Sequence, residues 1–254
     1  MHLAPIRVPI ERPIPTPLRP VPPSPLGSTV LHTAPALFVR PFNMPPNSPA
    51  TVHILRHGQS LHNVDRNHQF PDPPLTDIGR SQAKAVNPVA APDLIVVSPM
   101  TRTLETTLLA FDSFLGDPES QPIIQVWPEL RETHDFAVCN RGVSRAELEL
   151  KFPQFDFSEC RQEWDYPQHN PEDAVTRAET VRRRLKNLSG SHKNIFLVTH
   201  RGFIAFLVKG QRFDVAECRR YRFATEAESE MERHGQDSDT GMERDFGPTV
   251  LVPL

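Results

Sequence analysis

The chain has 254 residues, a formal net charge of -3 and 38% hydrophobic residues, and we expect one catalytic domain with tails. This charge excludes a global basic field that would hold nucleic acid or an anionic membrane, and no apolar run reaches the roughly 20 residues that span a bilayer. Cys139, Cys160 and Cys218 include no Cys-x-x-Cys pair. We therefore expect unpaired, buried thiols in a soluble, cytoplasmic protein.

The first 50 residues are a proline-rich arm that holds 14 of the 28 prolines. A segment that repeatedly lacks its backbone donor forms neither helix nor central strand, so an extended or disordered arm is expected for residues 1–50. Its few acids are typical of an organelle transit peptide and its prolines of an SH3 ligand. Because transit peptides are amphipathic helices, and because neither signal is specific, a passive tail is the interpretation that we favour.

From residue 51 the sequence alternates between strand-like and helix-like segments. The first four, strand and helix in turn, are 51–58, 75–86, 93–99 and 100–116. Strands separated by helix-length segments predict a mainly parallel sheet with helices packed on its faces. The predicted fold is an α/β domain over residues 51–254, arranged as a three-layer sandwich.

The pattern continues with a strand-like segment at 123–130 and a helix that opens at Ser144. Glu147 stands three residues after Ser144, which is the spacing of a capping box. A long helix is predicted from about Glu172 to Leu188.

One face of this long helix is apolar. Its apolar residues recur at spacings of three and four, and they are Val175, Ala178, Val181, Leu185 and Leu188. The basic residues lie off this face, and we expect a solvated surface formed by Arg177, Arg182, Arg183 and Lys186.

Two strand-like segments end in a histidine. The run TVHIL is followed by Arg56 and His57, and the run NIFLVT is followed by His200. In open parallel sheets the carboxyl ends of the strands form the edge where ligands bind, next to helix N-termini that favour anions. We therefore expect both imidazoles at one anion-binding edge.

The composition turns polar after residue 223, with eight acids and two arginines between Glu226 and Asp245. This balance predicts a mobile, acidic loop at about 225–245. The chain then finishes as FGPTVLVPL, for which we expect a short packed segment.

The residues around the two histidines suit a phosphate monoester, which is a dianion at neutral pH. Arg56 and Arg102 each offer a planar fork of donors to phosphate oxygens. An imidazole with a pKa near 6.5 is available unprotonated near neutral pH, and it can attack phosphorus to form a phosphoenzyme. A nearby carboxylic acid would protonate the leaving alkoxide and later take a proton from water.

These segments resemble the histidine phosphatase superfamily, the phosphoglycerate mutase-like fold. LRHGQSLHN, residues 55–63, is similar to its RHG motif, with Gln59 and Asn63 at motif positions. Four further segments are similar to family elements in the same order, and these are PLTDIGRSQA, SPMTRTLET, ELRETHDF and VTHRGF. The resemblance covers most of residues 51–223, and five ordered elements are far more specific than RHG alone.

The resemblance implies the chemistry of two residues. His57 would be the nucleophile that becomes phosphohistidine. Glu132, in the element that carries the family's proton donor, would be the general acid and then the base. Glu129 is its rival for that role, and the spacing of the element favours Glu132.

The resemblance also implies which residues bind the phosphoryl group. Arg56, Arg102 and His200 would hold it and stabilise its charge, and Asn63 and Gln59 would add neutral contacts. The substrate would be a small phosphorylated molecule. Neither a metal nor another cofactor is expected, because the cations of the pocket replace the metal.

The sequence departs from the family pattern at two places. Arg201 stands where the second histidine motif commonly has Gly, and it either reads a further substrate anion or points to solvent. Phosphoglycerate mutases of this fold carry a long insert beginning E-R-H-Y-G at the acid position, where this chain reads ETHDFAVCNRG. This difference favours the phosphatase branch over two alternatives, a phosphomutase and a catalytically weak adaptor that binds a phosphorylated ligand.

Overall fold

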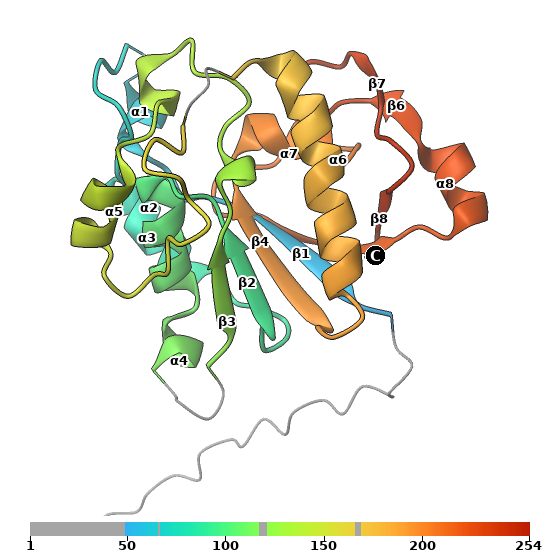
Figure 1. Cartoon of the computed structure of the whole chain (residues 1–254), viewed down its shortest axis with the longest axis horizontal. Helices are drawn as coiled ribbons and strands as arrows, with labels where there is room; N and C mark the ends of the chain where they lie inside the picture. Colours follow the sequence, from blue (N-terminus) through green and yellow to red (C-terminus); the bar gives the residue numbers. More distant parts are fainter. Residues whose placement is uncertain (1–48, 66, 117–120, 166–168) are drawn as a thin grey trace, which may run out of the picture. The chain divides into compact units, whose positions relative to one another are not determined.

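The structure is a computed structural model that describes residues 49–254 apart from 66, 117–120 and 166–168. Residues 1–48 of the predicted proline-rich arm lie outside the described residues. The centre of the fold is a six-stranded sheet with the order β3–β2–β4–β1–β5–β8 (Figure 1). The strands are β1 (Thr51–Arg56), β2 (Leu94–Val97), β3 (Ile123–Val126), β4 (Asn194–Thr199), β5 (Cys218–Phe223) and β8 (Leu251–Pro253).

The first four of these strands are parallel, and at one edge β5 pairs antiparallel with β1 and β8 pairs antiparallel with β5. Apolar runs such as LIVV in β2 are buried at every position, as expected for parallel strands that are covered on both faces. The prediction of an α/β fold with a mainly parallel central sheet is therefore confirmed.

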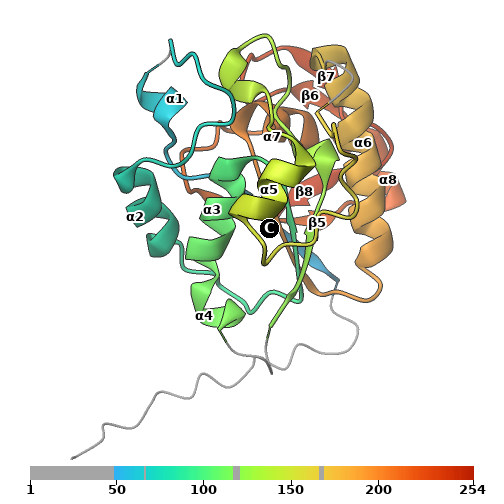
Figure 2. The ribbon, with the colours of Figure 1, turned by 60° about the vertical axis from the view of Figure 1, so that its left-hand side comes forward.

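Helices cover both faces of the sheet (Figures 1 and 2). The helical elements are α1 (Leu61–Val64), α2 (Asp77–Ala85), α3 (Thr101–Ala110), α4 (Asp112–Leu115), η1 (Pro128–Leu130), η2 (Val138–Asn140), α5 (Arg145–Lys151), α6 (Pro171–Leu188) and α7 (Arg201–Leu207). Val52 and Ile54 share a buried cluster with residues of α6 and α7. Leu55 and Phe196 share the opposite cluster with residues of α3 and α5. Strand alternation thus divides the core between two helical layers.

Local capping residues set where the helices begin. Thr76 accepts a hydrogen bond from the N–H of Gly79 at the start of α2, and Ser144 accepts one from the N–H of Glu147 at the start of α5, which is half of the predicted capping box. Asn170 caps α6 in the same way through the N–H of Asp173. The helix predicted over 100–116 is divided at Phe111, whose buried ring packs edge-on against Phe196 at 5.1 Å.

The prediction of a solvated arginine face on α6 is wrong for two of its members. Arg177 and Arg182 are buried, while Val175, placed on the apolar face, is 43% exposed. Arg182 donates to the carbonyl of Phe206 at 2.7 Å and to Glu179 at 3.0 Å. A guanidinium can be buried when carbonyl and carboxylate oxygens accept its N–H groups, and helical periodicity alone does not reveal such partners.

The prediction of a loop at 225–245 is also wrong, because this stretch forms α8 (Glu226–Glu232), β6 (His234–Gln236) and β7 (Glu243–Asp245). Thr225 and Glu228 make a capping box that begins α8. The strands β6 and β7 pair as a two-stranded ribbon, and Arg233 donates to Asp245 at 2.7 Å. The two arginines of this stretch, Arg233 and Arg244, pair with Asp245 and Asp237 within it.

Two expectations for the whole chain can be compared with the described residues. The three cysteines are free, but Cys160 alone among them is buried, and Cys218 is exposed. The final segment packs as expected, because Leu251 and Val252 of β8 are buried. No helix in the described part of the chain is both long enough and apolar enough to cross a membrane.

Candidate active site

A cavity of about 640 Å³ opens at the carboxyl ends of β1 and β4. The parallel register pairs Arg56 with Thr199, so the residues that follow the two strands lie side by side. The rings of His57 and His200 are 5.3 Å apart between centroids. The structure therefore brings the two predicted histidines together at this edge of the sheet.

His57 lines the cavity with its ring in a defined tautomer. Its Nδ1 atom lies 2.7 Å from the carbonyl oxygen of Gly58, which can only accept, so Nδ1 carries the proton and Nε2 keeps its lone pair. Burial, and next the positive charges of Arg102 and Arg56, hold the pKa of His57 well below its usual value near 6.5. The neutral ring can therefore act as a nucleophile over a wide pH range.

Two glycines fix the backbone that carries His57. The N–H of Gly58 donates to Thr106 Oγ1 of α3 at 3.1 Å. A Cβ atom on Gly58 would lie only 2.5 Å from the carbonyl oxygen of Gly79 in α2. The turn after β1 thus packs directly on α2, which explains why both segments need glycine.

Arg56 supplies a cation to the cavity. It lies at the end of β1, lines the cavity, and donates from Nη1 to the carbonyl of Phe213 at 2.8 Å. Burial lowers its pKa to about 10, so it stays protonated at neutral pH. A partly desolvated guanidinium beside a neutral imidazole is suited to an anion.

Arg102 and His200 lie behind the cavity and do not line it, since both side chains are fully buried. Arg102 Nε donates to His200 Nδ1 at 3.2 Å, so the proton of His200 is on Nε2, which donates to Ser98 Oγ at 2.8 Å. The predicted pair is therefore present, but each group already has partners.

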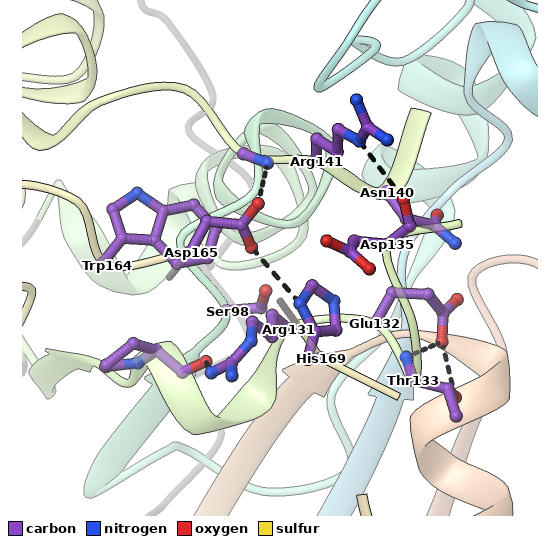
Figure 3. Close-up of polar contacts among 12 residues, drawn as sticks. Ser98, Arg131, Glu132, Thr133, Asp135, Asn140, Arg141, Trp164, Asp165 and His169 are labelled. Carbon is purple, nitrogen blue, oxygen red and sulfur yellow. Dashed lines mark hydrogen bonds and ion pairs between the residues drawn. The ribbon is translucent and has the colours of Figure 1, made fainter. Parts of the chain in front are cut away.

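The loop after η1 covers Arg102. Arg102 Nη1 donates to the carbonyl of Cys139 in this loop at 3.1 Å. The loop is braced by two bonds drawn in Figure 3, from Arg141 Nε to the carbonyl of Asp135 at 3.2 Å and from the N–H of Gly142 to Asp165 at 2.8 Å. These two bonds therefore hold the loop that places the Cys139 carbonyl against Arg102 of α3.

Glu132 lines the same cavity as His57. Its Oε1 atom accepts hydrogen bonds from Thr133 at the backbone N–H (2.9 Å) and at Oγ1 (3.1 Å) (Figure 3), and from the N–H of Phe203 at 3.1 Å. Glu129, its rival, does not line the cavity, and its Oε2 atom is buried. The geometry thus favours Glu132 as the carboxyl group that can exchange protons with a ligand.

Arg177 holds the loop of Glu132 from the side of α6. Its Nη1 atom donates to the carbonyls of Glu129 (2.8 Å) and Arg131 (3.0 Å). Its Nη2 atom donates to those of Glu132 (2.9 Å) and Thr133 (3.2 Å). Burial lowers its pKa to about 9. The buried arginine thus gives these four backbone carbonyls the hydrogen-bond donors that regular secondary structure would otherwise supply.

The sequence profile of the histidine phosphatase superfamily (branch 1) matches residues 52–240. The chain belongs to this superfamily. A probable phosphatase of Schizosaccharomyces pombe is 36% identical over 127 residues, which are 46% of this chain and 56% of that protein. The chain thus spans little more than half of the length of that relative.

Two further histidine phosphatase-like proteins are similar over more of the chain. A phosphoglycerate mutase-like protein of Arabidopsis thaliana is 26% identical over 198 residues, with 61% of this chain and 72% of that protein covered. The ecdysone phosphate phosphatase of Bombix mori, solved with tungstate, has a TM-score of 0.50 and 15% identity over 68% of this chain and 89% of its own. This last likeness concerns the fold.

The remaining residues of the histidine phosphatase RHG motif have separate positions. Asn63 lines the cavity, with Oδ1 accepting from the N–H of Ser60 at 3.0 Å. Gln59 does not line it, because its Oε1 atom accepts from Thr76 Oγ1 at 2.8 Å and so faces the start of α2. The prediction that Gln59 contacts phosphate is therefore not supported by its position.

The motif search missed several residues of this histidine phosphatase site. His62 lines the cavity 5.9 Å from His57 between ring centroids, and burial lowers its pKa to about 3. Ser98 binds His200, and Thr133 binds Glu132. All three lie inside the motif segments, where His62 and Thr133 are adjacent to Asn63 and Glu132, and Ser98 stands four positions before Arg102.

Arg201 lines the cavity and is ion-paired, while 39% of its side chain is exposed. Its Nε atom lies 3.1 Å from Oδ1 of Asp239, in the turn between β6 and β7. This ion pair joins the turn to α7, and the turn is held by Asp237, which accepts from Arg244 at 2.7 Å. The acidic segment that we expected to be a mobile loop therefore forms one wall of the site.

Proposed function

We propose that the protein is a phosphatase of small organic phosphate monoesters that transfers the phosphoryl group to His57 and then to water, without metal or other cofactor. The observation that carries this proposal is the bond from His57 Nδ1 to the carbonyl of Gly58, which leaves Nε2 unprotonated at the cavity. The superfamily and the name of the 36% identical relative support a phosphatase.

In the first step the lone pair of His57 Nε2 attacks phosphorus and the ester P–O bond breaks. The leaving alkoxide takes a proton from the carboxyl group of Glu132. The ring becomes positively charged as the N–P bond forms, and the Gly58 carbonyl stabilises that charge through the Nδ1 proton. The products of this step are the free alcohol, phosphohistidine and the Glu132 carboxylate.

In the second step the Glu132 carboxylate takes a proton from water, and the oxygen of that water attacks phosphorus. The N–P bond breaks and its electron pair returns to Nε2, which releases inorganic phosphate. Both residues are then in their starting protonation states. The same carboxyl group thus serves as acid and base.

Cations supply the stabilisation that a metal would otherwise give. At about 4 Å and an effective dielectric of about 20, one pair of unit charges is worth roughly 4 kcal/mol. Arg56 lines the cavity, and Arg102 lies behind it within range to lower the pKa of His57. We assign to both arginines the stabilisation of the negative charge of the transferred phosphoryl group. Asn63 would add a neutral donor, and His200 would act as a partner of Arg102.

The test is phosphate release from an aryl phosphate and from a panel of sugar phosphates, nucleotides, polyprenyl phosphates and phosphoamino acids. We expect wild-type activity with EDTA present, no turnover by His57→Ala, and unchanged turnover by the control His192→Ala. Wild-type protein quenched during turnover should carry acid-labile phosphate that His57→Ala lacks.

Other outcomes would replace the proposal. Full activity of His57→Ala would exclude His57 as the nucleophile. An isomerised product in place of free phosphate would identify a phosphomutase. Tight binding of a phosphorylated ligand without release of phosphate from any substrate would identify an adaptor. We place the reaction in the cytoplasm, and three free cysteines support a reducing compartment.

A further inference from the structure

Two arginines share one carboxylate oxygen at the wall of the cavity. Arg201 Nε lies 3.1 Å and Arg212 Nη2 lies 3.2 Å from the same atom, Asp239 Oδ1. Each guanidinium has five N–H donors, and within the described residues Asp239 is the one acidic partner of either. The three side chains together carry one excess positive charge.

This cluster lies next to the position proposed for the phosphoryl group. Arg212 precedes Phe213, whose carbonyl accepts from Arg56, and Arg201 follows His200. All three arginines line the same cavity. After burial, the charges of Arg201 and Arg212 are among the causes that lower the pKa of Arg56, which is consistent with their closeness.

The charge of the neighbouring arginine of the wall is already paired with a carboxylate of its own. Arg244 donates from Nε to Asp237 at 2.7 Å, and its guanidinium stacks over the ring of Phe206 at 3.8 Å. Asp237 in turn accepts from the N–H groups of Asp239 and Thr240, which fixes the turn that presents Asp239. The excess charge of the wall therefore belongs to Arg201 and Arg212.

We propose that Arg201 and Arg212 form a second anion site, so that the cavity prefers a phosphate monoester that carries a further carboxylate or phosphate over one with a neutral remainder. This inference rests on the proposed function, which puts the first phosphate at His57. Asp239 competes with the ligand for both guanidinium groups. A second acidic group on the ligand can neutralise the excess positive charge of the two arginines, which a neutral hydroxyl group cannot do.

The test measures binding by calorimetry in a His57→Ala background, which cannot turn the ligands over. Glycerol 3-phosphate is compared with 3-phosphoglycerate, which adds a carboxylate, and fructose 6-phosphate with fructose 1,6-bisphosphate, which adds a phosphate. We expect the ligand with the second acid to bind about tenfold more tightly in at least one pair, and the pair that responds identifies the acid.

Variants then separate recognition from bracing of the wall. Arg201→Ala and Arg212→Ala should bring the affinity ratio close to one, because the ligand with the second acid loses more affinity than its neutral partner. Asp239→Asn should raise the ratio, because it removes the competing carboxylate. The control Arg183→Ala, an exposed arginine of α6, should leave the ratio as it is.

Two results would overturn the inference: equal affinities within both pairs, or an Asp239→Asn variant that loses the preference as the arginine variants do. The second result would mean that the ion pairs only hold the turn between β6 and β7. Because binding is measured without turnover, a wild-type protein that releases no phosphate would contradict the proposed function and leave the second anion site standing.

Discussion

The backbone N–H of Phe203 donates to Glu132 Oε1 at 3.1 Å, which ties the proposed acid to the first turn of α7. Gly202 makes this contact possible. A Cβ atom on Gly202 would lie 2.6 Å from Thr133 Oγ1 and closer still to Glu132 Oε1. The glycine after Arg201 therefore determines where the carboxyl group of Glu132 can lie.

Replacing Gly202 should impair catalysis more than folding. In Gly202→Ala the methyl group displaces the Glu132 carboxyl group, and we expect kcat on an aryl phosphate to fall about 100-fold, since a positioned acid contributes on that order. The atoms that must move are the ends of side chains, and alanine favours the helix, so the free energy of unfolding should change by less than about 1 kcal/mol.

Gly190→Ala is the matched control, because a Cβ atom there meets only the Asn187 carbonyl oxygen at 3.7 Å. Urea unfolding and steady-state kinetics of both variants check the prediction. A wild-type kcat in Gly202→Ala would show that the position of the Glu132 carboxyl group does not limit turnover.

Removing Arg177 should affect both stability and activity. Arg177→Met leaves the carbonyls of Glu129, Arg131, Glu132 and Thr133 without their donor inside the protein. We expect a loss of about 3 kcal/mol in the free energy of unfolding, with a lower kcat because the loop of Glu132 loses its support. Urea unfolding measures the first effect, and Arg183→Met, on the exposed side of the same helix, is the control. Equal stabilities of the two variants would contradict the prediction.

The histidine His53 should make the protein less stable in mild acid. Its ring is buried and stacked on Phe196 at 4.1 Å, and burial lowers its pKa to about 4. The unfolded chain, with a pKa near 6.5, binds more protons between these values, so stability falls as the pH decreases from about 6.5 towards 4. At pH 5 this single group costs about 2 kcal/mol.

His53→Phe removes this titration and keeps an aromatic ring against Phe196. We expect the difference in unfolding free energy between pH 7 and pH 5 to be about 2 kcal/mol smaller than in the wild type. Urea unfolding at the two pH values measures it. An unchanged difference would mean that His53 is protonated to the same extent in the folded and the unfolded chain.

The protonation of His57 can be followed directly. Because burial and the Arg102 and Arg56 charges lower its pKa, the ring should stay neutral well below pH 6.5 in the free protein. Removing one of these charges in Arg102→Met should raise the pKa. Nuclear magnetic resonance of labelled histidine side chains, assigned with His57→Ala, reports both values. A wild-type His57 that titrates at or above pH 6.5 would contradict the prediction that burial and the two arginines lower its pKa.

The sequence predicted the parts of the fold and site that depend on local pattern. Continuous apolar runs identified β1, β2 and β4, and parallel strands predicted both histidines at one edge of the sheet. That they meet there follows from the pairing of β1 with β4, which the sequence did not predict. Ser144 could be recognised as a helix start because a cap bonds to residues only three positions away. The family resemblance favoured Glu132 over Glu129, and of the two only Glu132 lines the cavity.

Features that depend on distant partners escaped this reasoning. Arg177 looks like a surface residue of α6, because the carbonyls that bind it lie more than 40 residues earlier in the chain. The ribbon of β6 and β7 reads as a solvated acidic segment until Arg233 and Arg244 are matched with Asp245 and Asp237. Gln59 was misplaced because the motif does not say that Thr76 captures its side chain.

The burial of Arg102 under the Cys139 carbonyl has a consequence for ligand binding. A guanidinium in water must lose its hydration shell before it can contact a phosphate oxygen, and that loss weakens binding. Arg102 leaves water when the protein folds, and the carbonyl and the ring of His200 replace its hydration shell. The oxygens of a phosphate that reaches Arg102 would take the place of these protein acceptors. The guanidinium would then lose no hydration shell on binding, because it lost that shell when the protein folded.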